Sequence, residues 1–253
     1  MLKMHYVGDL KTNRDYYLKT RFPNLTFLFQ KRFNWMNNHI LDTDQVLEVG
    51  CGIGVTKLFV DKGNITLSDV VDNPWVDQLE DALHLSYEDN SLDVIIINNT
   101  LHHLAYPIGF FQEARRVLKK GGKILIQDVN CSFAMQRLLR LMNIEDFNFN
   151  VDVFDANTIC TNAQNPWDGN NAITTLLFKD VQKFEEQVPY FQVLEKKYSE
   201  FFVYVVSGGI SGKTFTVPLP YGILKGLDFV DELIATAVPK LLALQMRVVL
   251  QKK

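Results

Sequence analysis

The 253-residue sequence predicts an α/β fold, in which a mostly parallel sheet of seven strands carries helices on both faces. Short apolar runs rich in Val and Ile alternate with segments of helical period, as in parallel sheets whose strands are buried on both faces. The first run, residues 45–49, leads into a turn with glycine at positions 50, 52 and 54. A glycine turn after a first strand is typical of open, Rossmann-like sheets.

The chain is expected to form one domain, residues 1–253, which begins with an N-terminal arm and a helix in residues 1–44. Residues 1–24 are polar and aromatic, and form either a surface arm or a lid over a ligand. Apolar side chains then recur at steps of four, three and four, which predicts a helix with one buried face. These side chains are those of Phe29, Phe33, Met36 and Ile40.

Residues 45–130 are expected to form the core of the sheet. The expected strands are residues 45–49, 65–68, 75–78, 92–98 and 123–128, with helices at residues 55–60 and 110–118. Only a handful of residues separate Asp69 from the third of these strands, whereas a parallel crossover usually needs a dozen or more. We therefore expect a turn in place of a crossover helix there, and a very short third strand.

Residues 131–195 are expected to form a cap inserted after the fifth strand, and residues 196–253 to close the sheet. A helix should run from Met135 to about Asn143, with an irregular stretch at residues 144–178, a length usual for functional loops. Its aromatic residues, Phe147, Phe149, Phe154 and Trp167, fit no regular period and form either a pocket wall or a satellite core. The remaining expected elements are helices at residues 181–187 and 224–237 and an antiparallel pair of strands at residues 201–206 and 244–251.

Composition narrows the class of partner. A net charge of -3 and a pI near 6.0 give no basic field for nucleic acid, so small molecules or lipids are favoured. Cys51, Cys131 and Cys160 show neither metal-ligand spacing nor a disulfide framework, and no metal is predicted. With no signal-like N-terminus and no long apolar run, the expected location is the cytoplasm, with contact to a membrane surface left open.

The glycine turn belongs to a longer ordered set of motif residues. The turn itself has the spacing G-x-G-x-G and not the dinucleotide pattern G-x-G-x-x-G. With Glu48 before the turn and Asp69, Asp81-Ala82 and Asn98 after it, the sequence from Val46 to Asp128 resembles the class I S-adenosylmethionine-dependent methyltransferases. It is most similar to the type 11 branch, typified by the ubiquinone and menaquinone biosynthesis methyltransferases. The resemblance implies that the cofactor is bound by Glu48, Gly50, Cys51, Gly52, Gly54, Asp69, Asp81, Ala82 and Asn98.

Roles follow for individual side chains. Asp69, at the end of its strand, can accept hydrogen bonds from ribose hydroxyls, whereas Asp72 reads more readily as a turn residue. The resemblance implies that Asp81 accepts from the adenine amino group and that Ala82 contributes its backbone amide. His103, or its neighbour His102, is the candidate base, because imidazole titrates near neutrality and the resembling family places this position at the methyl group. A histidine that only packs locally is the competing interpretation.

The expected function is methyl transfer from S-adenosylmethionine to a small-molecule or lipid-like acceptor, leaving S-adenosylhomocysteine. A nicotinamide-dependent oxidoreductase shares the strand, turn and acidic residue, but the glycine spacing and Asp81-Ala82 argue against it. A non-catalytic binding or regulatory protein with the same fold is the other alternative. The sequence specifies neither the attacking atom nor the oligomeric state.

Overall fold

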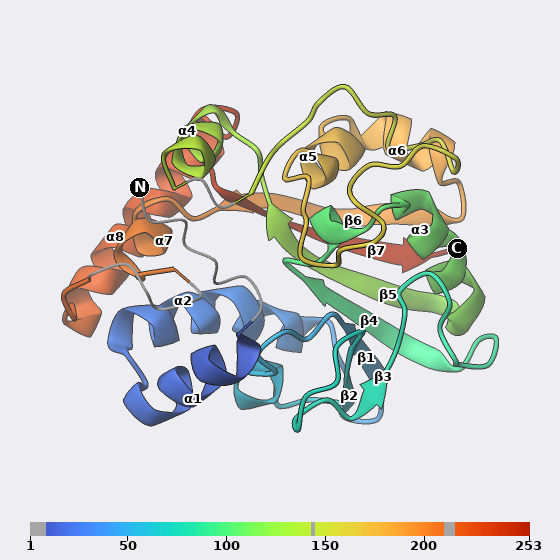
Figure 1. Cartoon of the computed structure of the whole chain (residues 1–253), viewed down its shortest axis with the longest axis horizontal. Helices are drawn as coiled ribbons and strands as arrows, with labels where there is room; N and C mark the ends of the chain where they lie inside the picture. The colour runs from blue at the N-terminus through green and yellow to red at the C-terminus, as the bar shows by residue number, and fades with distance from the viewer. Residues whose placement is uncertain (1–8, 143–144, 210–215) are drawn as a thin grey trace.

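A computed structural model describes residues 9–142, 145–209 and 216–253. Across them, seven strands form one sheet in the order β3-β2-β1-β4-β5-β7-β6 (Figure 1). The strands are β1 (Gln45–Val49), β2 (Asn64–Asp69), β3 (Gln78–Leu79), β4 (Leu92–Asn98), β5 (Leu118–Val129), β6 (Phe191–Ser199) and β7 (Gln245–Lys252). The first five are parallel, and β7 runs antiparallel to both β5 and β6. The predicted fold class is confirmed.

Helices cover the sheet on both faces (Figure 1). They are α1 (Leu10–Thr20), α2 (Pro23–Phe33), α3 (Pro107–Val117), α4 (Phe133–Met142), α5 (Ile173–Phe178), α6 (Val181–Gln187), α7 (Phe202–Val206) and α8 (Tyr221–Ala237), with short 3-10 helices η1 (Asn34–Asn38), η2 (Thr56–Leu58) and η3 (Leu101–His103). Residues of α1, α2, α7 and α8 share one buried cluster, those of α3, α5 and α6 share a second, and Met135 of α4 belongs to a third, smaller one. Among the described residues, no helix is both long and apolar enough to cross a bilayer.

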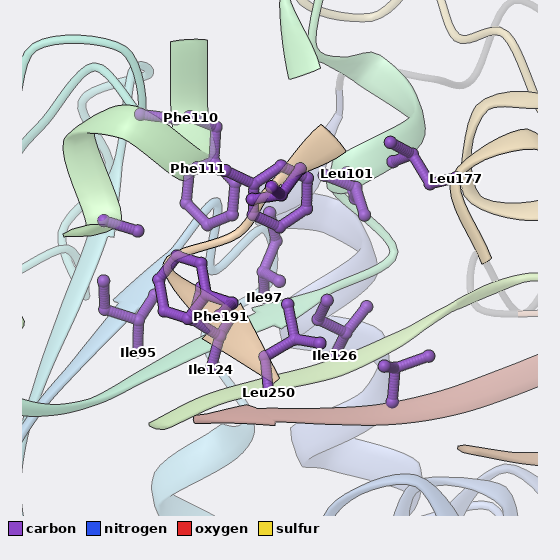
Figure 2. Packing of buried hydrophobic residues seen from close by; sticks show 14 of the residues in the cluster. Ile95, Ile97, Leu101, Phe110, Phe111, Ile124, Ile126, Leu177, Phe191 and Leu250 are labelled. Carbon is purple, nitrogen blue, oxygen red and sulfur yellow. The ribbon is translucent and has the colours of Figure 1, made fainter. Parts of the chain in front are cut away.

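The central strand β4 supplies the first two clusters because its side chains alternate between the faces. Ile95 and Ile97 pack under α3, while Val94 and Ile96 pack under α2. On the α3 side, Phe111 lies among other buried rings, and its ring centroid is 5.3 Å from that of Phe184. Figure 2 shows Phe111 with its neighbours in this cluster, among them Phe110 and Phe191. Burying each such side chain contributes about 1.5–3 kcal/mol, so this core holds β4 and β5 firmly in place.

The elements between the glycine turn and β4 agree with the sequence analysis in the main. β1 and β4 have the predicted bounds, and β3 is only two residues long, because a turn replaces the crossover helix before it. The helix expected at residues 55–60 is reduced to η2. The helix expected to reach Asn143 is α4, whose described part ends at Met142; Asn143 lies outside the described residues.

The strand predicted at residues 201–206 is wrong: these residues form helix α7, and β6 lies at residues 191–199 instead. The aromatic and β-branched run favours a strand by propensity alone. The buried carboxylate of Asp231, on α8, accepts hydrogen bonds from the backbone N–H groups of residues 201, 202 and 203 at 2.8–3.0 Å. A tertiary contact thus satisfies the first N–H groups of α7, as a local cap would. A register shift between Val193 and Glu195 hides β6 from a periodicity analysis.

Candidate functional site

A cavity of about 430 Å³ lies at the carboxyl ends of β1, β2, β4 and β5. In open α/β sheets this edge is where ligands bind. Of the nine residues predicted to hold the cofactor, all except Gly54 line this cavity, and so does His103. The sheet therefore brings residues that are up to fifty positions apart in the sequence to one wall.

The three glycines of the turn have different neighbours. A Cβ at Gly50 would lie 2.3 Å from Thr100 Cγ2, and one at Gly54 would lie 2.2 Å from Trp75 Cδ1, so both positions are closed by packing. At Gly52, where φ is +53°, a Cβ would meet no atom within 4 Å. Gly52 is therefore the glycine whose backbone a ligand in the cavity can approach.

Asp69 stabilises the turn from the end of β2. Its Oδ2 accepts a hydrogen bond from the Gly52 N–H at 2.9 Å, and its Oδ1 accepts one from the Val71 N–H at 3.1 Å. Each carboxylate oxygen keeps a second lone pair, and the side chain lines the cavity. Asp72 is exposed and does not line the cavity, as a turn residue would be.

Glu48 is buried at the end of β1 with only one of its oxygens paired. Oε1 accepts a hydrogen bond from Thr56 Oγ1 at 2.7 Å, whereas Oε2 has no partner among the described residues. Burial raises the pKa of this carboxyl from 4.5 to about 7. An unpaired buried oxygen on the wall of a cavity costs free energy unless a ligand pairs with it.

The opposite end of this wall is polar and partly exposed. The carboxylate of Asp81 accepts from the Leu83 N–H at 2.9 Å, and Ala82 beside it is buried. Asn98, at the end of β4, accepts a hydrogen bond from the Asn99 side chain at 2.9 Å. Asp81 and Asn98 therefore keep further acceptor capacity for a ligand in the cavity.

His102, the neighbour of His103 in the sequence, lies in a buried network that the sequence analysis did not predict. Its Nδ1 lies 2.6 Å from Asp128 Oδ1, and its Nε2 lies 3.5 Å from Glu145 Oε2. Although burial lowers the pKa of His102, the carboxylates of Asp128 and Glu145 raise it to about 10. For Glu145, burial works against the same attraction, and its pKa falls to about 2.

The imidazole of His103 is in the opposite state. Burial and the neighbouring His102 charge lower the pKa of His103 to about 4, so its ring is neutral at pH 7. Its Nδ1 is buried and has no hydrogen-bond partner among the described residues. The two rings lie 4.2 Å apart between centroids. His103 thus lines the cavity with a neutral ring whose Nδ1 has no partner in the described structure.

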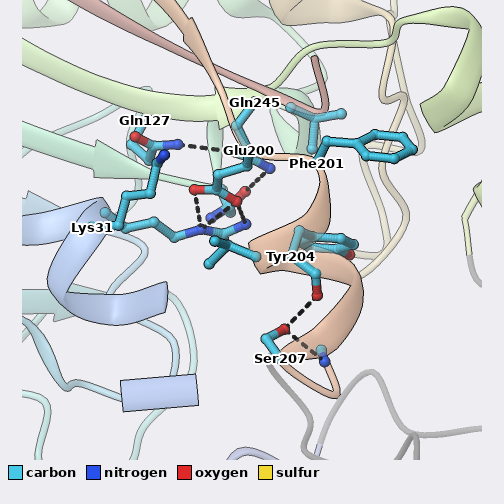
Figure 3. Close-up of polar contacts among 12 residues, drawn as sticks. Lys31, Gln127, Glu200, Phe201, Tyr204, Ser207 and Gln245 are labelled. Carbon is cyan, nitrogen blue, oxygen red and sulfur yellow. Dashed lines mark hydrogen bonds and ion pairs between the residues drawn. The ribbon is translucent and has the colours of Figure 1, made fainter. Parts of the chain in front are cut away.

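A buried ion pair supports the far side of the cavity. The Arg32 guanidinium binds the Glu200 carboxylate through Nε at 3.0 Å and Nη2 at 2.7 Å, and both side chains are almost fully buried. The guanidinium carbon lies 5.6 Å from the Tyr204 ring centroid. Figure 3 shows Glu200 and Tyr204 together with Gln245, which bonds to Gln127 at 3.0 Å. The Arg32–Glu200 ion pair joins α2 to the segment before α7, two segments that are 168 residues apart in the sequence.

The apolar wall comes from α4 and not from most of the rings that the sequence singled out. The face of α4 predicted from its spacing lines the cavity through Met135, Leu138, Leu139 and Met142. Of the aromatic residues in the irregular stretch, Trp167 lines the cavity. Phe147 and Phe154 pack against the α3-side core, and Phe149 is 39% exposed. One of the four rings thus lines the cavity, and two pack on the main core and form no separate satellite cluster.

The N-terminal helix α1 lies against the glycine turn. Leu10 and Asn13 line the cavity. Arg14 donates from Nη1 to the backbone carbonyls of Ile53, at 2.5 Å, and Gly54, at 2.7 Å. These contacts hold α1 next to the turn, as the lid interpretation of this segment requires.

Sequence analysis missed Arg32, Asp128 and Glu145 as site residues. Arg32 does fall on the face marked by Phe29, Phe33 and Met36 and is therefore a charged residue at a buried helical position. Asp128 ends the strand predicted at residues 123–128 and follows Gln127, the partner of Asn98 in the sheet, so the common edge of the parallel strands could have indicated it. For Glu145, in an irregular stretch, the sequence gives no signal.

Comparisons with known proteins agree with this geometry. A family model described as a methyltransferase domain matches residues 47–126. The matched part of this chain is a methyltransferase domain. The family that the motifs resemble is thus confirmed, and it implies S-adenosylmethionine as the cofactor.

One curated relative and two solved structures illustrate how far the likeness extends. The chain is 29% identical over 104 residues to 27-O-demethylrifamycin SV methyltransferase of Amycolatopsis mediterranei (strain S699), and the match covers 34% of this chain and 38% of that protein. A SAM dependent methyltransferase from Archaeoglobus fulgidus has a TM-score of 0.56 at 14% identity, covering 94% of this chain and 99% of that one. A SAM-dependent methyltransferase from Thermotoga maritima, described as a possible histamine N-methyltransferase, has a TM-score of 0.52 at 14% identity, covering 98% of each chain. At such identity the solved structures show the fold alone.

The residues of the methyltransferase domain fit this cofactor. The sulfonium and amino groups of S-adenosylmethionine are positively charged, and the cavity wall offers the unpaired Oε2 of Glu48 and the carboxylate of Asp69. Gly52 leaves room for a ligand against the backbone of the turn. The set thus matches the charge and the shape of the cofactor at this end of the cavity.

Proposed function

We propose that the protein is an S-adenosylmethionine-dependent methyltransferase that acts on a small-molecule or lipid-like acceptor. The observation that carries the proposal is the mixed lining of one cavity. The glycine turn with Glu48 and Asp69 lines it, and so do the apolar face of α4 and His103. A donor held by the first group and an acceptor held by the second would share this one cavity.

When bound, the cofactor supplies a methyl group on a positively charged sulfur, which the acceptor attacks in line. The chain's part is to hold the two molecules in this geometry, which by itself supplies much of the rate enhancement in reactions of this kind. Gly52 and Asp69 would hold the donor. The side chains of α4 keep water out, which favours a reaction that loses charge on sulfur.

His103 is the residue that we propose to act on the acceptor. It lines the cavity, its Nδ1 is free, and its low pKa of about 4 keeps the lone pair available at neutral pH. That lone pair can receive a hydrogen bond from an acceptor O–H or N–H group and direct the attacking atom toward the methyl group. The network around His102 holds the neighbouring backbone in place.

The nature of the acceptor follows from the wall of the cavity. Met135, Leu138, Leu139 and Met142 favour a partly apolar molecule, and the acidic net charge disfavours nucleic acid. The curated relative, whose name gives 27-O-demethylrifamycin SV as its acceptor, is consistent with a small molecule. We expect the protein to act in the cytoplasm.

Calorimetric titration with S-adenosylmethionine, S-adenosylhomocysteine and NAD tests the cofactor. We expect binding of the first two and none of NAD; binding of NAD alone would contradict the proposal. Incubation of cell extract with labelled donor, followed by mass spectrometry, then tests transfer and identifies the acceptor. Binding of the donor with no labelled product in any extract would instead favour the non-catalytic alternative.

Substitution of His103 separates binding from transfer. His103→Ala should keep the affinity for S-adenosylhomocysteine within a few-fold and lower the rate of transfer by about 10²–10⁴-fold, the usual contribution of a positioned acid–base group. His39→Ala is the matched control, because His39 lies outside the cavity lining and contacts Trp35. Equal rates in the two variants would remove His103 from the proposal.

A further inference from the structure

Ligand atoms from two separate segments converge in one corner of the cavity. His102, His103 and Glu145 each offer one nitrogen or oxygen, and these atoms lie within 4.8 Å of one another. All three residues line the cavity. We propose that this corner binds a divalent transition-metal ion, zinc being the expected one, with an open coordination position toward the acceptor.

His102 is oriented as a metal-binding histidine usually is. Its Nδ1 faces the buried carboxylate of Asp128 at 2.6 Å, and its Nε2 lies 3.5 Å from Glu145 Oε2, so an ion bound between Nε2 and Oε2 would take the place of the proton that pairs them. Protein histidines that bind metals almost always donate their other ring N–H to a carboxylate or carbonyl in this way. Asp128 is held in turn by the backbone N–H of Leu101 at 2.8 Å.

His103 supplies a nitrogen that nothing else in the described structure uses. Its Nδ1 is buried without a hydrogen-bond partner. Leaving such a group unpaired costs about 1–3 kcal/mol, so a bound ion would remove a defect that the protein otherwise carries. Neutral imidazole is also the form that binds metals.

Glu145 and the loop behind it close the corner. Asn171 Nδ2 donates to Glu145 Oε2 at 2.9 Å, which orients the carboxylate. A Cβ at Gly169 would lie 2.9 Å from His102 Cδ2, 3.2 Å from His103 Cε1 and 3.2 Å from Glu145 Oε2. The backbone at Gly169 therefore packs directly against all three candidate ligands, and a side chain there would push them apart.

The donor set indicates the class of ion. Two imidazoles and one carboxylate, with a further position left open, are the ligands of many catalytic zinc sites, whereas magnesium and calcium prefer oxygen alone. Ligand bonds of about 2.0–2.2 Å at tetrahedral angles put ligand atoms about 3.3 Å apart. The candidate ligands, at up to 4.8 Å, must close by roughly 1.5 Å at most when the ion binds.

The role of the ion rests on the proposed function, although the existence of its site does not. Because the three ligands line the same cavity as the apolar side chains of α4, an ion held by them would have its open position toward the space that we assign to the acceptor. An ion there would hold a hydroxyl oxygen of the acceptor and lower the pKa of that hydroxyl, so that its proton is released to water and the oxygen attacks as the anion. With Nδ1 bound to the ion, His103 would act on the acceptor through the ion and not by accepting a hydrogen bond from it.

Metal binding can be measured without turnover. The untagged full-length protein is freed of metal with a chelator, dialysed, and titrated with cobalt chloride, followed by visible absorption, and with zinc chloride, followed by calorimetry. We expect one equivalent of either ion per chain. His103→Ala and Glu145→Gln should each weaken binding at least tenfold, whereas the control His39→Ala should leave it unchanged.

Two results would overturn the site: no stoichiometric binding to the native chain, or binding that both substitutions leave intact. Titration of the same samples with S-adenosylhomocysteine keeps this test apart from that of the proposed function. Retained cofactor affinity shows that a variant is folded. Metal binding without cofactor affinity would sink the proposed function and leave the site standing, and the reverse result would do the opposite.

Discussion

The cavity has two sides that are built in different ways. The side that we propose for the cofactor, called the cofactor side, is residues 45–98 and consists of strand ends and the turns that follow them directly, so each side chain is positioned by the sheet itself. The acceptor side, residues 102–171 with α7, is held by contacts between distant segments, such as the Asn171 bond to Glu145 and the Arg32 pair with Glu200. One side is fixed by local sequence, and the other depends on tertiary packing.

This difference suggests that the two sides answer differently to substitution. A change on the cofactor side should alter binding with little effect elsewhere, because its groups are anchored in the most buried strands. A change on the acceptor side should spread, because a single side chain there often joins two or three elements. The predictions below test this contrast.

The largest effect is expected at Gly52. Gly52→Val should abolish detectable binding of S-adenosylhomocysteine, a loss of more than about 100-fold, because the new side chain fills the space that faces the ligand. The control is Gly121→Val, at a position that also has positive φ and only one atom, Gln251 Nε2 at 3.8 Å, near its Cβ. Both variants carry similar backbone strain, so only the first should lose binding. Undiminished affinity in a folded Gly52→Val protein would refute the cofactor assignment.

The next largest effect concerns the two acids after β2. Asp69→Ala should weaken binding of S-adenosylhomocysteine by about 10- to 100-fold, from the loss of charged hydrogen bonds worth about 1.5–3 kcal/mol. It also removes the acceptor of the Gly52 N–H, which loosens the turn. Asp72→Ala should change the affinity less than about threefold, because Asp72 is exposed and outside the cavity lining. Calorimetric titration of both variants with S-adenosylhomocysteine measures the two affinities. A larger loss in Asp72→Ala than in Asp69→Ala would show that the role of the acid at the end of β2 is misassigned.

How much the sequence predicts follows the same division. Glu48, Gly52 and Asp69 could be placed from the sequence because each stands within a few residues of a strand whose burial shows in its apolar run. Glu145 could not be placed, because it reaches His102 through an irregular segment whose sequence shows no helical or strand periodicity. The misassigned residues 201–206 have the same cause: the Asp231 carboxylate that caps α7 lies about thirty residues further on.

The charge on Glu48 gives a third, smaller test on the cofactor side. Because its pKa is about 7 when folded and 4.5 when unfolded, the unfolded chain releases this proton first as the pH rises. The free energy of unfolding should therefore fall between about pH 4.5 and 7, by at most about 3 kcal/mol from this group. Glu48→Gln should remove that part of the fall, while Glu88→Gln, on the surface, should not. Denaturant titrations at several pH values measure it, and parallel curves for native protein and Glu48→Gln would contradict the shift.

The smallest effect is expected in the backbone dynamics of the acceptor side. Many amides of residues 145–171 are paired only with nearby Asn and Asp side chains or within single turns, such as Asn150 with Asn148 Oδ1 and Thr158 with the Asp155 carbonyl. Such turns open at little cost in free energy, whereas β4 opens only with the sheet. Without ligand, these amides should exchange hydrogen faster than those of β4.

Two amides of that stretch give an internal control for this prediction. Cys160 donates to the Ala105 carbonyl at 2.9 Å and Asn170 to the His102 carbonyl at 2.9 Å, so both are tied to the segment after β4. They should be protected more than the tips between them. Binding of S-adenosylhomocysteine should slow exchange near Trp167, which lines the cavity, by a few-fold. Strong protection of residues 145–171 equal to that of β4, with and without ligand, would show that this side is as rigid as the sheet and would contradict the prediction.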